Sequence, residues 1–90
     1  MSVSADLIEQ RLRQALRPQH LRVIDESADH AGHVGANDTG RGTHFRVQIG
    51  GAAFDTLTRL ARHRLVYDAV QDLMSQGVHA LAIEVVPFDR

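Results

Sequence analysis

Histidine is the residue type in this chain with the clearest capacity for chemistry. Six of the 90 residues are histidines, and the sequence contains no cysteine. His30 and His33 lie three residues apart in a glycine-rich segment, residues 25–45, where two imidazoles can reach one metal ion. The H-x-x-H spacing alone does not define a zinc site, because a polar loop with incidental histidines has the same sequence. The pair therefore needs further ligands from elsewhere.

His79 is the third candidate ligand. It lies at the start of the apolar segment 78–86, and strand alternation places it on the same face as Leu81 and Ile83. A histidine in such a position is typically a half-buried structural residue. The start of this strand and the loop near His30 and His33 can share one rim of a sheet. Histidines from distant positions would then converge there, whereas His20 and His44 are expected at the surface.

A second group of candidate residues lies on a predicted helix. It consists of Arg59, Arg62, His63 and Arg64, and the guanidinium groups can fork around phosphate or carboxylate. The simpler interpretation is a solvated helix face. The formal net charge is −1 with neutral histidines, which gives no overall attraction to nucleic acid.

Catalytic motifs are not evident. A chain without cysteine has no thiolate nucleophile and no cysteine-based metal site of its own. Asp25, Ser27 and His30 include the residue types of a catalytic triad, but neighbouring loop residues rarely adopt triad geometry. The first residues resemble no signal peptide, and no apolar run is long enough to span a bilayer. We expect a cytoplasmic protein that is not an enzyme and does not bind membranes.

The candidate residues are positioned by elements that apolar periodicity predicts. A helix capped by Ser4 should end before Pro18, and strands should follow over 21–25 and 44–49. Residues 54–75 are expected to form a short helix or turn and then a longer helix that ends near Gly77. The last segment, 78–86, is almost continuously apolar, which predicts a strand with both faces largely covered.

This order of elements, α-β-β-α(α)-β, predicts an α+β domain. The first two strands should be antiparallel, and the last strand, reached over a helical crossover, should be parallel to one of them. We therefore expect a small mixed three-stranded sheet with helices on one face. A single domain should span residues 1–90, with a variable loop at about 26–43.

Four segments, taken together, resemble the BolA family. They are DESADHAGH, GTHFRV, ARHRLVYDAV and GVHALAIEV, in that order, and the resemblance covers about residues 5–86. One departure is Thr56, where the family often has glycine. The resemblance implies a fold like the type II KH domain and a non-enzymatic role in iron–sulfur cluster assembly or trafficking.

The same resemblance implies a partner and a ligand set. BolA-like proteins form heterodimers with monothiol CGFS glutaredoxins and hold or exchange a [2Fe–2S] cluster. The glutaredoxin and glutathione would supply thiolates, while this chain would supply His79 and either His30 or His33. Paired imidazoles also ligate one iron in Rieske centres. We expect no tightly bound cluster in the isolated chain.

The resemblance also implies an alternative function. Some BolA proteins are described as DNA-binding transcriptional regulators of the stress or morphology type. In this chain the segment with Arg59, Arg62, His63 and Arg64 would be the contact surface of an arrangement that resembles a helix-turn-helix.

Overall fold

The computed structural model describes residues 3–27 and 42–86, and its first element is an amphipathic helix. α1 (Ala5–Leu16) begins where the Ser4 Oγ accepts a hydrogen bond from the N–H of Leu7, at 3.1 Å. It ends at Leu16 and is capped by Arg17, whose backbone adopts the left-handed conformation with φ 47° just before Pro18. Both ends agree with the sequence prediction.

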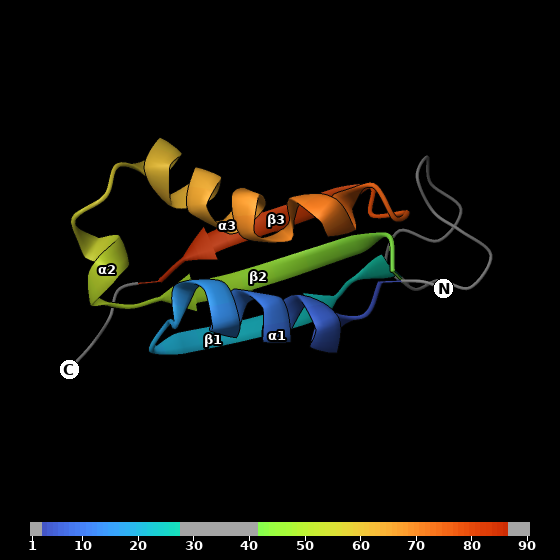
Figure 1. Ribbon diagram of the computed structural model, residues 1–90, viewed down its shortest axis with the longest axis horizontal. Coiled ribbons are helices and arrows are strands. Elements are labelled where there is room, and N and C mark those ends of the chain that lie inside the picture. The colour runs from blue at the N-terminus through green and yellow to red at the C-terminus, as the bar shows by residue number, and fades with distance from the viewer. Residues whose placement is uncertain (1–2, 28–41, 87–90) are drawn as a thin grey trace.

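Three strands form one mixed sheet with the predicted topology. β1 (His20–Asp25) pairs antiparallel with the central β2 (His44–Gly50), and β2 pairs parallel with β3 (Ala80–Val85). The crossover from β2 to β3 contains α2 (Ala52–Asp55) and α3 (Arg59–Met74). The prediction of a short helix followed by a longer one is thus confirmed (Figure 1).

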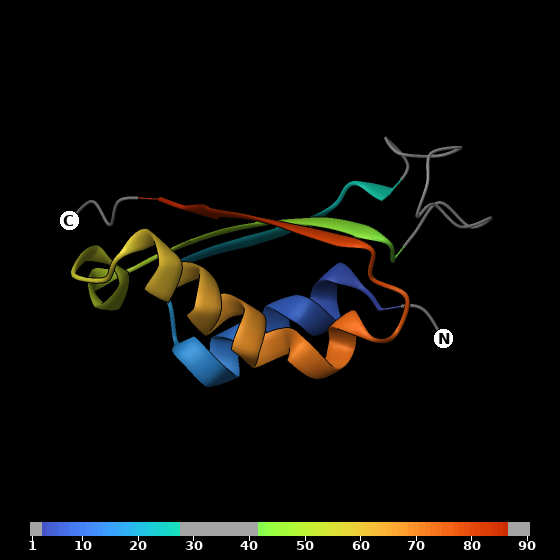
Figure 2. The same cartoon turned by 90° about the horizontal axis from the view of Figure 1, so that it is seen from above.

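The helices α1 and α3 cover one face of the sheet, and the core lies between these two layers (Figure 2). The strands contribute buried side chains at alternating positions. The buried apolar residues are Val3, Ile8, Leu12, Phe45, Val47, Ile49, Phe54, Val66, Val70, Leu73, Val78 and Leu81. Among the described residues, no helix is both long and apolar enough to cross a membrane.

The opposite face of the sheet carries charged side chains. Arg46 donates from Nε to Glu26 at 3.0 Å and from Nη1 to Glu84, and these bonds raise the pKa of the Arg46 guanidinium. The expectation that both faces of the last strand are largely covered is therefore wrong. The segment has an almost continuously apolar sequence because Ala82, which lies opposite Arg46 in the register of β2 and β3, is apolar as well as small.

Candidate functional site

The candidate site lies at one rim of the sheet. β1 ends there, and β2 and β3 both begin there, at the right-hand end in Figure 1. The carbonyl of Thr43 accepts hydrogen bonds from the N–H groups of His79, at 2.7 Å, and Ala80, at 3.1 Å. These bonds hold the His79 backbone against β2 at the base of the β1–β2 connection.

His79 itself is exposed and precedes the regular part of β3. Its ring does not join the buried face with Leu81, as strand alternation predicts, but packs beside the ring of His44. The ring centroids are 5.3 Å apart and the planes are tilted by 51°. The imidazole of His79 is therefore accessible for coordination of a metal, and the neighbouring ring of His44 restricts its position.

His44 is the residue at this rim that the sequence interpretation placed wrongly. It was expected at the surface with its outward neighbours on β2, yet only 7% of it is exposed. Its Nδ1 lies 2.9 Å from the Thr43 Oγ1, and its ring contacts His79. His79 is distant in the sequence, so alternation within β2 cannot reveal this contact.

A hydrogen-bonded clamp closes the base of the β1–β2 connection. The fully buried Ser27 accepts from the N–H groups of Thr43 and His44, at 2.9 and 3.0 Å, and its hydroxyl donates to Asp25 at 2.5 Å. The second carboxylate oxygen of Asp25 accepts from the N–H of Gly42 at 3.1 Å. Asp25 and Ser27, which had only a superficial likeness to triad members, thus hold the two ends of the connection together.

The other two predicted ligands, His30 and His33, lie outside the described residues. Within residues 3–27 and 42–86, no three histidine, cysteine, aspartate or glutamate side chains gather as a metal-binding group. The described part of the rim therefore offers a single accessible imidazole, that of His79. Such a donor can complete the coordination of a metal centre whose other ligands come from the loop or from another molecule.

The predicted arginine group lies near the opposite end of the sheet and is divided between different environments. Arg62 is half-buried and donates from Nε to the carbonyl of Phe54 at 2.8 Å and from Nη2 to that of Asp55 at 3.3 Å. These carbonyls belong to α2, so Arg62 fixes the short helix onto α3. The plainer interpretation of the arginine group, that it packs the fold, thus holds for Arg62.

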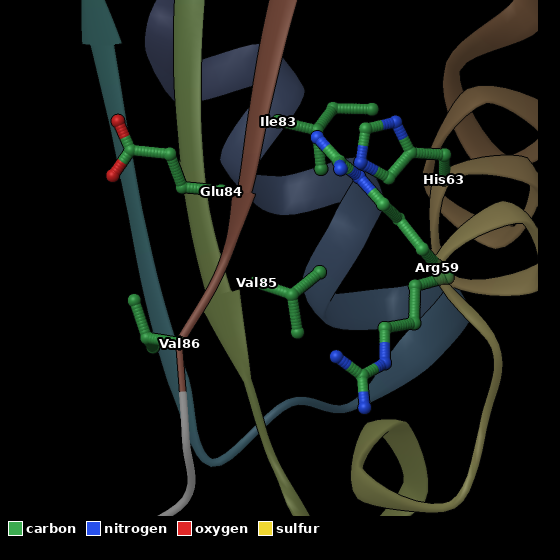
Figure 3. Close-up of a pocket in the computed structure, with 7 residues that line it drawn as sticks. Arg59, His63, Ile83, Glu84, Val85 and Val86 are labelled. Carbon is green, nitrogen blue, oxygen red and sulfur yellow. The ribbon is translucent and has the colours of Figure 1, made fainter.

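Arg59 and His63 face β3, whereas Arg64 borders a separate groove with Leu60 and Asp68. In Figure 3 the side chains of Arg59 and His63 point from α3 toward β3. The predicted residues therefore do not form one continuous basic surface. Contact with DNA through this segment stays a prediction.

Comparisons with known proteins agree on one family. The family described as BolA-like protein matches residues 12–88. An uncharacterised Sinorhizobium protein encoded in the 5′ region of cobS is 40% identical over 79 residues, which are 88% of this chain and 85% of that protein. Mouse BolA-like protein 1 is 40% identical over 77 residues, which are 86% of this chain. The chain spans only 53% of that relative's length.

A solved structure shows the same likeness in three dimensions. The BolA domain of SufE1 from Arabidopsis thaliana superimposes with a TM-score of 0.78 at 37% identity and covers 92% of this chain and 90% of that domain. The order of the elements, the mixed sheet with helices on one face, and the family match all lead to one assignment. The chain belongs to the BolA-like family.

Proposed function

We propose that this chain is a non-enzymatic protein of iron–sulfur cluster assembly or trafficking. It would form a heterodimer with a monothiol CGFS glutaredoxin and help to hold a [2Fe–2S] cluster as cargo between the two proteins. His79 would be one ligand, and His30 or His33 would be the second. The glutaredoxin and glutathione would supply the thiolates that this cysteine-free chain lacks.

The observation that carries this proposal is the exposed imidazole of His79 at the rim from which the β1–β2 connection departs. The segment that contains His30 and His33 begins and ends at the same rim, since Asp25 and Ser27 bind Gly42, Thr43 and His44. This topology supports a ligand pair drawn from distant parts of the sequence. The contact with His44 supports a fixed orientation for the His79 ring.

Reconstitution of the heterodimer tests the proposal. The chain is mixed with a CGFS glutaredoxin that carries a [2Fe–2S] cluster and glutathione, and visible absorption and circular dichroism are recorded. We expect a new spectrum for the heterodimer and its loss or marked change in His79→Ala. Parallel His30→Ala and His33→Ala variants identify the second ligand.

His20→Ala is the matched control for these variants. His20 is exposed but begins β1 at the opposite end of the sheet, so its removal should leave the spectrum unchanged. If His79→Ala gives the wild-type spectrum, then His79 is not a ligand. If the glutaredoxin spectrum does not change on mixing with the folded wild-type chain, the proposed partnership is wrong.

A further inference from the structure

A groove separates the first half of α3 from the free edge of β3. It has a volume of about 500 Å³, within the range of ligand-binding pockets. Arg59, Arg62 and His63 form one wall, and Ile83, Val85 and Val86 form the other. In Figure 3 the side chains of Ile83 and Val85 point into this space, whereas Glu84 points away to the other side of β3.

The strand that borders this groove has backbone groups directed toward it. The N–H groups of Ala80 and Val86 donate to the carbonyls of Thr43, just before β2, and Ile49 of β2, at 3.1 and 2.9 Å. From Ala80 onward the even-numbered residues of this segment therefore face β2. Backbone polar groups alternate in direction along a strand, and the odd-numbered residues therefore face the open edge. Accordingly, the carbonyl of Leu81 accepts a hydrogen bond from the Tyr67 hydroxyl of α3, at 2.9 Å.

The edge beyond Leu81 is different because the groove lies between it and α3. In the described part of the chain, no side chain bonds to the backbone groups of Ile83 or Val85 in the way that Tyr67 bonds to Leu81. An exposed strand edge of this kind is a template for pairing with another extended chain. The helix on the far side of the groove leaves room for that chain's side chains.

The charges along the groove indicate what that chain would carry. Arg59 is exposed and makes no ion pair with any described side chain, and His63 lies one helical turn further along the same wall. Arg62 contributes positive charge while it binds the α2 carbonyls. Among the described residues that line the groove, the one carboxylate is that of Glu84, which is paired with Arg46 on the other face of the sheet. An acidic partner segment is therefore complementary to the groove.

We propose that this groove binds an extended, acidic segment of a partner protein, which adds as a strand to the free edge of β3. Its backbone would pair with Ile83 and Val85, and its carboxylates would face Arg59 and His63. The apolar wall would accept alternate side chains of the segment. This proposal does not depend on cluster binding at His79.

A peptide fits the groove better than a nucleic acid does. Nucleic-acid binding relies mainly on neutralising many phosphates, whereas this groove has few cations and one of them, Arg62, is already bound to carbonyls. Arg64, which would extend a basic surface, lines a different groove. The free backbone groups at the strand edge suit a peptide, since nucleic acids cannot continue a β-ladder.

The experiment titrates the ¹⁵N-labelled chain with an acetylated eight-residue peptide in which glutamate alternates with valine. We expect the largest amide shifts at Ile83 and Val85, with slower hydrogen exchange there. Arg59→Gln should weaken binding by roughly three- to tenfold, as expected for loss of a charge-assisted contact. The matched control is Arg64→Gln, on the same helix but facing the other groove, which should bind like wild type.

Two altered probes separate strand addition from simple charge attraction. A peptide methylated on alternate backbone nitrogens should lose binding because it cannot pair with the edge, and a lysine-for-glutamate peptide should not bind. Equal binding of the methylated peptide overturns the proposal. It is also overturned if a single-stranded oligonucleotide shifts the same amides more strongly than the peptide, or if the chain occupies its own edge by self-association.

Discussion

The rim of the sheet depends on a few residues with separate tasks. His79 is exposed, His44 packs beside its ring, and Ser27 holds the backbone of His44 in place. Of these three residues, only His79 would ligate the cluster in the proposed function. The other two residues determine where the His79 ring lies, and they do so through contacts between segments that are distant in the sequence.

Replacing Ser27 should therefore destabilise the rim. Ser27→Ala leaves the buried N–H groups of Thr43 and His44 without their acceptor, and we expect the free energy of unfolding to fall by about 2–3 kcal/mol. Chemical denaturation measures this loss. Ser75→Ala removes a hydroxyl from an exposed helix end and should cost about 0.5 kcal/mol or less. Equal losses in the two variants would contradict the clamp.

Residue-scale prediction from the sequence succeeds for local features and fails for the long-range ones. The Ser4 cap is a local pattern that involves residues three positions apart, and the structure confirms it. The contact of His44 with His79 joins the two ends of the crossover, and the clamp requires Ser27 to meet Thr43 across a long connection. No periodicity within either segment contains that information.

At the scale of elements, the sequence predicts the strands and helices well because their apolar patterns are regular. The break between α2 and α3 is visible as a change of helical phase, and the structure places Thr58 there as the cap of α3. Thr56 has an ordinary helical backbone, so its replacement of the family's usual glycine needs no left-handed conformation. The open face of β3 was missed because Ala82 is apolar without being in the core.

Close packing of β2 against the end of β3 predicts a specific intolerance. A Cβ atom added at Gly50 would lie 2.4 Å from the Val86 carbonyl oxygen, which is backbone and cannot move aside alone. We expect Gly50→Ala to lower the free energy of unfolding by about 1–3 kcal/mol, as overpacking does.

The neighbouring glycine provides the control for this prediction. At Gly51 an added Cβ would meet chiefly the flexible Gln19 side chain, so Gly51→Ala should cost less than Gly50→Ala in the same thermal or denaturant measurement. If Gly51→Ala is the more destabilising variant, then contact with Val86 is not what prevents a larger side chain at Gly50.

At the scale of the whole molecule, the two proposed surfaces lie at opposite ends of β3. His79 and Val85 are six positions apart, which corresponds to about 20 Å along an extended strand. A cluster at the rim and a partner segment in the groove need not exclude each other. The length of β3 thus separates the two proposed surfaces.

The helical layer is joined by an ion pair whose contribution depends on pH. Arg11 on α1 donates to Asp72 on α3, and this bond holds the pKa of the Asp72 carboxyl below its ordinary value. The stabilisation is therefore present above the ordinary carboxyl pKa of about 4 and is lost as the pH falls through the lower, folded value.

Asp72→Asn tests this dependence. The variant should unfold at a slightly lower temperature than wild type at pH 7, and the difference should shrink as the pH is lowered below the ordinary carboxyl pKa of about 4 and the wild-type carboxylate takes up a proton. Glu9→Gln, which alters an exposed pair with Arg13 within α1, serves as the control and should have a smaller effect at pH 7. If the difference in unfolding temperature between Asp72→Asn and wild type grows on acidification, the expected pH dependence is wrong.

The central claim is that His79 ligates the cluster, and nitrogen hyperfine spectroscopy tests it most directly. The reduced heterodimer is prepared with this chain ¹⁵N-labelled only at histidine, and pulsed electron paramagnetic resonance is recorded. We predict strong ¹⁵N couplings from two imidazoles in the wild type and loss of one coupling in His79→Ala. Absence of ¹⁵N coupling from the wild-type chain, or couplings unchanged in His79→Ala, would contradict the claim.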